Sequence, residues 1–522
     1  MPSVTNKAAA IGLRSERGPV LAAIMLATGL VALDSTIIAT AVPSVVSDLG
    51  GFAQYPWLFS IYLLTQAVTV PLYGKFADLL GRKPVLFFGI GVFLLGSVLC
   101  GFAWNMLSLI VFRAVQGIGA GAVLPISVTI IGDIYSVDER AKVQGYTASV
   151  WGAASVLGPA LGGTFSQYLT WRWIFFVNIP VGALAVWMLA THLRESVTRR
   201  RHQIDYLGAA TLTIGCTLLI LGLLEGGVAW SWGSAASVIV FAAAAAALGG
   251  FVFVEQRAAE PVLPLWVFRH RTLVGGNLAA LVTGGVLIAL SSYVPSLAQG
   301  VLGAGPVVAG FTLAAMSVGW PIASTLSGRA YMRIGFRDTA LAGSALLIVG
   351  TVLCALLIQR TNLLEVAGVC FVVGAGLGLA STPVLVAVQS VVGWDRRGVV
   401  TGANMFFRSM GSAVGAAIFG AIANTTLAGR FTHPPAAVHG RLPHSVDATS
   451  LVLGGRLKAE PGAVADYIRT SLFTATHNVF LALIAAAALG LLAVLLMPRH
   501  TRELPNQPAP TDRHRGNGPP VD

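Results

Sequence analysis

The sequence predicts an all-α integral membrane protein. Hydrophobic residues make up 55% of the 522 residues and charged residues 10%, and the mean hydropathy is +0.78. No water-soluble globular fold can bury that much apolar surface. Apolar stretches of about 20 residues recur along the chain, each long enough to cross a hydrocarbon core of about 30 Å. We therefore expect a polytopic protein in a lipid bilayer.

Fourteen membrane spans are expected. The first contains Asp34 and Pro43 and is longer than the apolar region of a signal peptide, so we expect a retained helix rather than a cleaved leader. The expected spans are residues 19–43, 57–74, 84–104, 107–132, 144–166, 173–193, 206–225, 235–255, 273–299, 305–328, 338–358, 362–389, 401–424 and 473–497.

The placement of the basic residues predicts the orientation. If the N-terminal tail, residues 1–18, is cytoplasmic, most of the 33 Lys and Arg residues fall on that side, in the tails and alternate loops. The short opposite loops hold Arg172 and Arg360. This is the positive-inside pattern, so we interpret the net charge of +12 as an orientation signal rather than a nucleic-acid site. The excess of Arg over Lys is typical of a GC-rich bacterium, which would place the protein in the cytoplasmic (inner) membrane.

Recurring glycine spacings predict an internal duplication. Three sets of glycines repeat in the same order at an offset of about 255 residues, as in many duplicated transporters. The pairs are Gly74 and Gly81 with Gly328 and Gly335; Gly117, Gly119 and Gly121 with Gly374, Gly376 and Gly378; and Gly158 and Gly162 with Gly411 and Gly415. The expected parts are one six-helix bundle (19–193), a basic linker with two inserted spans (194–272), a second six-helix bundle (273–497) with a long external loop (425–472), and a disordered cytoplasmic tail (498–522).

Asp34 is the first candidate functional residue. A charge at the bilayer centre costs about 2.5 to 3.5 kcal/mol, so this carboxylate needs a partner or a proton. Arg113 lies in the fourth span, with Gln116 on nearly the same helical face. A rearrangement that changes the contact between Asp34 and Arg113 would make Asp34 a proton-binding switch. The alternative is a fixed ion pair that only packs helices together.

The loop between the second and third spans predicts a gate. The segment GKFADLLGRKPVL, residues 74–86, places an acid one turn after a glycine and before a basic pair. A carboxylate there pairs with basic groups or a helix N-terminus in one conformation and loses them in another. The alternative is a static turn with a positive anchor. The candidate gating residues are Gly74, Asp78, Gly81, Arg82 and Lys83, with Arg140 in a mixed-charge loop (Asp133, Asp138, Glu139, Arg140, Lys142) that would hold the other half.

Small residues in the fifth span predict a bent, closely packed helix. Glycine lets two backbones approach, and neighbouring helices satisfy the groups that a proline frees. The residues are Gly145, Ala154, Gly158, Pro159, Gly162 and Gly163.

Other polar and aromatic residues are less distinctive. Glu225, Glu255 and Arg408 fall at or near the expected span ends, where interfacial exposure is the default, and Glu225 is the best candidate for a second titratable site. Trp151 and Trp320 either pack or line a substrate cavity.

The sequence holds no sign of an enzyme. It contains no GxxxxGK[ST] loop for ATP phosphates and no zinc spacing, so we expect neither a cofactor nor a metal, and energy from an ion gradient. The cysteines lie inside apolar spans without CxxC spacing and are expected to be inert: Cys100, Cys216, Cys354 and Cys370.

Five motifs resemble those of the fourteen-span drug:proton antiporter family of the major facilitator superfamily. They are LDSTIIATAVP (33–43), GKFADLLGRK (74–83), RAVQGIGAG (113–121), GPALGG (158–163) and WRWIFFVNIPVG (171–182). The resemblance implies two six-helix bundles plus two inserted helices, in a monomer that exchanges protons for drugs or antibiotics. It implies proton coupling by Asp34 and Arg113, gating by Asp78 and Arg82, and a sealing bend at Gly158-Pro159.

Two departures from the family pattern qualify the resemblance. Ala154 stands where the antiporter motif usually has glycine, and the tenth span, FTLAAMSVGWPIASTL, lacks the carboxylate that exporters of divalent cations tend to carry. We therefore expect a small lipophilic substrate that is neutral or monocationic. The alternatives are a dedicated exporter of a metabolite, siderophore or self-made antibiotic and, in another class, a membrane sensor or scaffold that transports nothing.

Overall fold

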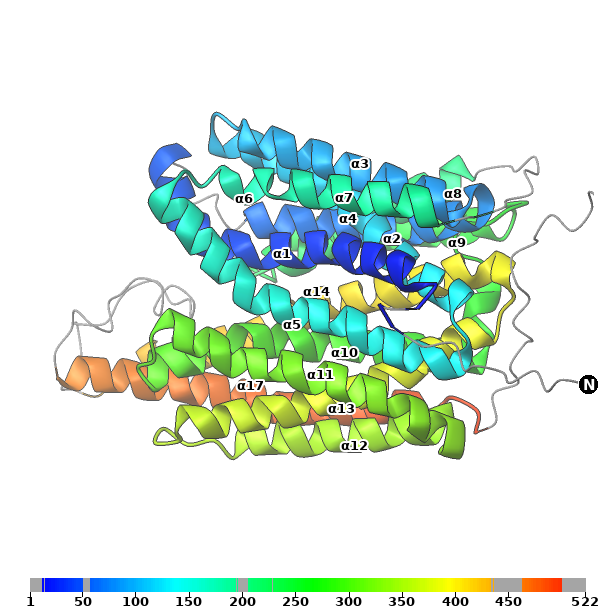
Figure 1. The fold of residues 1–522 in the computed structure, drawn as a ribbon. Coiled ribbons are helices and arrows are strands. Elements are labelled where there is room, and N and C mark those ends of the chain that lie inside the picture. The colour runs from blue at the N-terminus through cyan, green and yellow to red at the C-terminus, as the bar shows by residue number, and fades with distance from the viewer. Residues whose placement is uncertain are drawn as a thin grey trace, which may run out of the picture.

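The computed structural model describes residues 12–13, 15–49, 57–193, 195, 205–227, 229–432, 435 and 462–499, and these are almost entirely helical. Figure 1 shows long helices running roughly parallel in two layers. Among the described residues, twelve helices are long and apolar enough to cross a membrane. The prediction of an all-α membrane protein is confirmed.

Each expected span corresponds to a helix, and the sixth is broken into α6 and α7. The helices of the first half are α1 (Gly18–Leu49), α2 (Trp57–Leu80), α3 (Arg82–Gly101), α4 (Met106–Ile134), α5 (Val137–Tyr168), α6 (Trp173–Phe176) and α7 (Asn178–His192). Those that follow are α8 (Tyr206–Glu225), α9 (Ala235–Glu255), α10 (Arg271–Ser296), α11 (Pro306–Ile334), α12 (Phe336–Ala355), α13 (Leu363–Ser390), α14 (Arg397–Thr432) and α17 (Ala463–Leu495).

The count of fourteen spans is not confirmed in full. The expected spans 57–74 and 144–166 are the helices α2 and α5, which are not among the twelve apolar helices. Both helices pack against the two halves of the protein, α2 against α4 and α14, and α5 against α1 and α11. A helix that faces protein on several sides does not need a uniformly apolar surface. Spanning by these two helices stays a prediction.

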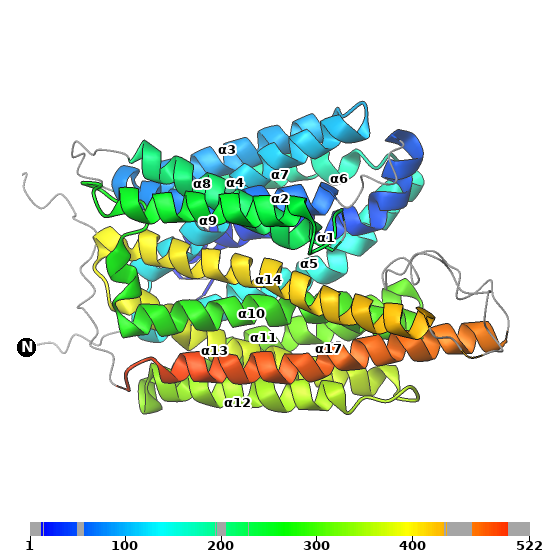
Figure 2. The ribbon, with the colours of Figure 1, turned by 180° about the vertical axis from the view of Figure 1, so that it is seen from behind.

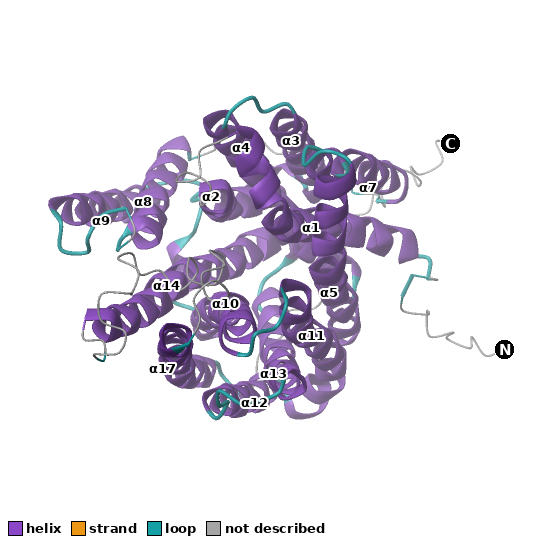
Figure 3. Cartoon of the chain, turned by 90° about the vertical axis from the view of Figure 1, so that its left-hand side faces the viewer, coloured by secondary structure: helices purple, strands orange, loops and turns teal. Residues whose placement is uncertain are grey.

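The two halves form two groups of helices. In Figure 1, α1, α2, α3, α4 and α7 lie above α10, α11, α12, α13 and α17, and α5 runs obliquely from one group to the other. The view along the helices shows the same division (Figure 3). The inserted helices α8 and α9 pack on each other, and α8 touches both α2 and α14 (Figure 2). The insertion therefore lies beside the contact between the halves.

Paired glycines make equivalent contacts in the two halves. Gly117 meets the backbone of Tyr62 on α2, and Gly374 meets that of Met316 on α11. Gly81 and Gly335 both have positive φ values, 99° and 88°, which allow sharp turns into α3 and α12. The repeated spacings therefore mark places where backbones touch or turn.

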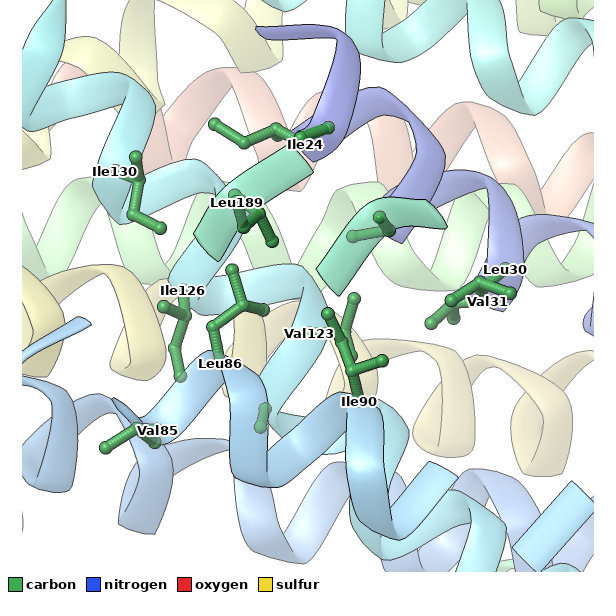
Figure 4. Close-up of a cluster of buried hydrophobic side chains, with 14 of the residues drawn as sticks. Ile24, Leu30, Val31, Val85, Leu86, Ile90, Val123, Ile126, Ile130 and Leu189 are labelled. Atoms are coloured by element: carbon green, nitrogen blue, oxygen red, sulfur yellow. The ribbon is translucent and has the colours of Figure 1, made fainter. Parts of the chain in front are cut away.

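The interior of the first half is a continuous apolar cluster. Ile24 and Val31 of α1 lie close to Ile90 of α3, Val123 of α4 and Leu189 of α7 (Figure 4). All five side chains are buried. This packing fixes α1 against α4, which carry Asp34 and Arg113.

Several expected segments lie wholly or mostly outside the described residues. These are the N-terminal tail, the basic linker before residue 205, and the C-terminal tail after residue 499. The external loop expected at 425–472 is shorter than that, because α14 continues to Thr432 and α17 begins at Ala463. Helices of 36 and 33 residues are longer than the hydrocarbon core requires, so their ends extend past it.

Gly411 provides a test of the close packing between α10 and α14. A Cβ atom at this position would collide with the carbonyl oxygen of Leu281. We expect Gly411→Ala to destabilise the protein by about 1 to 3 kcal/mol, the usual cost of overpacking, and to lower the thermal midpoint in detergent. Gly420→Ala on the same helix is the control, because nothing lies within 4 Å of its Cβ position. Equal midpoints for the two variants would contradict this packing.

Candidate functional site

Asp34 and Arg113 form an ion pair inside the first half. Arg113 Nη1 lies 2.6 Å from Asp34 Oδ2, and each side chain is 1% exposed. Gln116 Nε2 donates to Asp34 Oδ1 at 2.8 Å, and its Oε1 accepts from Arg113 Nη1 at 2.7 Å. The structure therefore brings together all three residues that the first and fourth spans suggested.

Three further residues surround this ion pair. The Arg113 guanidinium stacks over the Tyr62 ring, 4.2 Å from its centroid. Ser97 Oγ accepts from Gln116 Nε2 at 3.2 Å and from Asn178 Nδ2 at 2.9 Å. The motifs did not single out Tyr62, Ser97 or Asn178. The signal was available for Asn178, which is the polar residue inside the apolar run WIFFVNIPVG.

The ion pair and the residues around it connect five helices of the first half, α1, α2, α3, α4 and α7. Ionised Asp34 accepts hydrogen bonds from Arg113 and Gln116, so its charge is compensated in a region without bulk water. A proton on Asp34 would remove its attraction for Arg113. The Arg113 guanidinium would then contact only the Tyr62 ring and uncharged oxygens. Arg113 itself keeps its proton.

The small residues of α5 lie next to this site. Gly158 lies against Thr36, two residues after Asp34, and the Thr36 hydroxyl donates to the Ala154 carbonyl oxygen at 2.9 Å. Gly145 lies against Thr325 of α11. Thus α5 touches α1 at one point and the second half at another.

The remaining residues of that motif differ in their surroundings. Gly162 is buried, whereas nothing lies within 4 Å of a Cβ atom at Gly163. The side chain of Pro159 lies outside the described residues. The close-packing role is therefore visible at Gly145, Ala154 and Gly158.

The candidate gating residues Asp78 and Arg82 belong to a cluster that joins the two halves. Asp78 accepts from the amides of Gly398 and Val399, at 2.9 and 2.8 Å, in the first turn of α14. A carboxylate at a helix N-terminus satisfies free amides and the helix dipole. We call this group the latch cluster, and its members are Asp78, Arg82, Asp133, Trp394, Arg397, Gly398 and Val399.

Arg82 is at the centre of the latch cluster. Its guanidinium lies 2.9 Å from Asp78 Oδ1 and 3.0 Å from Asp133 Oδ2, and it is 2% exposed. It also stacks over the Trp394 ring at 3.7 Å. Asp133 in turn pairs with Arg397 at 3.0 Å. Sequence reasoning found Asp78, Arg82 and Asp133, but not the partners near residue 397, because only the fold brings α14 to α2.

Glycines allow the two halves to meet at the latch cluster. A Cβ atom at Gly74 would be 2.6 Å from the carbonyl oxygen of Gly398. Arg140 is buried nearby and donates to the carbonyl oxygens of Gly132 and Tyr135. Lys83 lies elsewhere, donating to the carbonyl oxygens of Ala190 and Leu193 at the end of α7. A gating role for Lys83 stays a prediction.

Two of the three charges expected at or near span ends are less exposed than predicted. Glu225 and Glu255 are buried, at 9% and 4% exposure, and Glu255 accepts from the Leu263 amide at 2.7 Å. Arg408 lies eleven residues inside α14 and keeps an intermediate exposure. Glu225 and Glu255 do end α8 and α9, but their side chains are covered by protein rather than exposed. Glu225 makes no described contact with Asp34.

The two candidate cavity tryptophans lie on neighbouring helices of opposite halves. Trp151 on α5 is 37% exposed, and Trp320 on α11 is partly buried against the apolar cluster of the second half. Gly152, next to Trp151, lies against Ser317 of α11. Cavity lining by both rings stays a prediction.

The WRW motif fixes α6 and α7 to the end of α1. Arg172 Nη1 and Trp171 Nε1 both donate to Asp48 Oδ2, at 2.7 and 3.0 Å. These hydrogen bonds, the Arg172 bond first, lower the pKa of Asp48 below its usual value. This exposed pair lies at the other end of α1 from Gly18, outside the apolar part of the helix.

Comparisons with known proteins agree on one family. Residues 24–416 match the family model described as Major Facilitator Superfamily. The chain is 32% identical to Multidrug transporter protein MdtP of Bacillus subtilis (strain 168), over 93% of this chain and 94% of MdtP. It is 31% identical to Multidrug resistance protein 3 of the same organism, over 92% and 94%.

Two solved structures have the same fold. The human organic anion transporter MFSD10 (TETRAN) matches with a TM-score of 0.58 and 15% identity, over 90% of this chain and 99% of that one. The proton:xylose symporter XylE matches with a TM-score of 0.60 and 12% identity, over 94% and 97%. At these identities the likeness is one of fold alone.

The buried pair gives a prediction for stability. Arg113→Met leaves the Asp34 carboxylate buried without its cation, which should cost about 3 to 5 kcal/mol. Asp34→Asn in the same chain removes that charge, so we expect the double variant to recover much of the loss. Thermal midpoints of the purified single and double variants measure this. A double variant no more stable than Arg113→Met would show that the two charges are not coupled.

The latch cluster gives a prediction for access. Asp78→Asn removes the charge that binds Arg82 and the first turn of α14, so we expect the two halves to separate more often at this end. A cysteine at Thr401, which is 0% exposed, should then react faster with a maleimide, over a background of four buried native cysteines. Asp338→Asn is the control, because among the described residues the Asp338 carboxylate forms an ion pair only with Arg499, at 3.6 Å. Unchanged labelling in Asp78→Asn would argue against a gate.

Proposed function

This chain belongs to the Major Facilitator Superfamily, and from that premise we propose that it exports small lipophilic compounds in exchange for protons, by alternating access. It is a multi-pass membrane transporter rather than an enzyme. The observation that carries the proton-coupling proposal is the enclosed Asp34 carboxylate, bonded to Arg113 and Gln116 and separated from bulk water. The relatives named as multidrug proteins support the substrate class.

The coupling step begins with a proton on Asp34. Protonation weakens the bond to Arg113, so the contact between α1 and α4 changes. Because Thr36 of α1 is bonded to Ala154 of α5, and α5 lies against α11, the change reaches the contact between the halves. Opening of the latch cluster then exposes the space between the halves to the opposite side of the membrane.

The proposed side of the latch cluster is the cytoplasm. The positive-inside pattern places the loop between α2 and α3 and both termini there. An intact latch cluster then corresponds to a conformation closed to the cytoplasm. We propose the cytoplasmic (inner) membrane of a bacterium as the location, a monomer as the working unit, and the proton gradient as the energy source without a cofactor.

The proposed substrate is lipophilic, with Trp151 and Trp320 as candidate contacts. No carboxylate occurs in α11, which disfavours dications. Of the neutral and monocationic compounds expected, the neutral ones fit better, because Arg408 adds a positive charge to the interior of α14. One proton entering through a membrane potential of about 150 mV releases about 3.5 kcal/mol, and exchange for a neutral compound uses all of it.

The test is transport by the purified full-length protein in vesicles. We expect addition of rhodamine 123 or a neutral lipophilic dye to drive proton movement, read by a pH-sensitive dye inside the vesicles. Asp34→Asn should abolish the pH change inside the vesicles, because an amide side chain does not bind a proton near neutral pH. Asp48→Asn, an exposed acid on the same helix, should leave it intact. Substrate-driven proton movement that persists in Asp34→Asn would refute the role assigned to Asp34.

A further inference from the structure

Arg408, like Arg113, is an arginine within an expected membrane span. It lies eleven residues after Arg397, the first residue of α14. At a rise of about 1.5 Å per residue it is about 16 Å from the end that carries the latch cluster, near the middle of a hydrocarbon core of about 30 Å. Transporters of this kind bind their substrates at that depth, between the halves.

The face of α14 that carries Arg408 points into the protein. At about 100° per residue, Thr401, Asn404 and Ser412 lie within about 40° of Arg408 around the helix. Each of these three bonds to another helix of the second half: Thr401 accepts from Gln389 at 3.1 Å, Asn404 donates to the Gly276 carbonyl at 3.0 Å, and Ser412 donates to the Gly284 carbonyl at 3.1 Å. Arg408 therefore lies on the polar inner face, toward α10 and α13.

The same face borders the first half. Gln389, the partner of Thr401, also donates to the carbonyl oxygen of Val128 on α4, at 3.2 Å. Arg408 lies two turns further along α14 from Thr401 on nearly the same line. Arg408 therefore continues the line of residues that meets the first half at Thr401, further from the latch cluster.

The guanidinium of Arg408 has no partner among the described residues. Among the described residues, no hydrogen bond, ion pair or ring contact involves its side chain, which keeps an intermediate exposure in the middle part of α14. Arg113 contrasts with it, since Asp34, Gln116, Leu58 and the Tyr62 ring occupy its donors and face. An unpaired charge at this depth is costly and marks a functional site by default.

We propose that Arg408 binds the anionic group of the exported compound, and that organic acids are a preferred substrate class. The planar guanidinium matches a carboxylate or sulfonate with two parallel hydrogen bonds, and an apolar body of the substrate would fill the space between the halves. This inference rests on the proposed function and adds the charge of the substrate. When one proton enters and one monoanion leaves, the membrane potential favours both movements, and two charges are transferred in each cycle. Export of an acid is therefore more strongly driven than export of a neutral compound.

The experiment compares two dyes of one scaffold and opposite charge. Fluorescein, a xanthene acid, and rhodamine 123, a xanthene monocation, are offered separately to vesicles that contain the purified full-length protein. We expect the KM for fluorescein to rise at least tenfold in Arg408→Gln. The rise should be smaller in Arg408→Lys, because lysine keeps the positive charge but lacks the two parallel N–H donors of the guanidinium. Rhodamine 123 transport should stay the same or improve. Arg360→Gln, at an exposed arginine in a loop, is the control.

The outcomes separate the two proposals. Fluorescein transport that is unchanged in Arg408→Gln, or equal losses for both dyes in properly folded protein, would overturn the role of Arg408. Transport of rhodamine 123 but not fluorescein by the native protein would also overturn it while leaving proton-coupled export in place. Gel filtration of each variant shows that it is folded, and faster fluorescein transport on raising the membrane potential would support the proposed charge movement.

Discussion

The ion pair between Asp34 and Arg113 is the interaction on which the rest of the structure depends. Both side chains are almost fully buried, and neither charge is tolerable there without the other. The pair joins α1 to α4, and Gln116, Ser97 and Asn178 extend it to α3 and the start of α7. The network therefore links α1, α3, α4 and α7 through buried polar contacts.

The two halves are similar in packing but not in charge. Gly74 and Gly328 both lie where a helix of one half meets the other half, against α14 and α5 respectively. The residues that correspond to Asp78 and Arg82 at the same offset are Met332 and Phe336, so the second half has no charged counterpart of the latch cluster. Instead, the Tyr331 hydroxyl donates to the Val137 carbonyl oxygen.

Much of the fold and of the site was predictable because membrane helices have strong local signals. The length of the apolar stretches predicted the helices, and the repeated glycine spacings predicted the equivalent contacts in the two halves. The cost of placing a charge in lipid pointed to Asp34 and Arg113. The partners of Asp78 on α14 were not predictable, since they are more than 300 residues away in sequence. The position of Arg408 within its helix was also not predictable: the apolar stretch 401–424 put it near a span end, whereas α14 is longer and Arg408 lies eleven residues inside it.

The most direct measurement of the central claim is infrared difference spectroscopy of the purified protein, recorded as the pH is lowered with and without a transported dye. The account predicts a band from a protonated buried carboxylic acid whose titration shifts when the dye binds, and which is missing in Asp34→Asn. A band whose titration does not change when the dye binds, or a band that remains in Asp34→Asn, would contradict the claim that Asp34 carries the coupled proton.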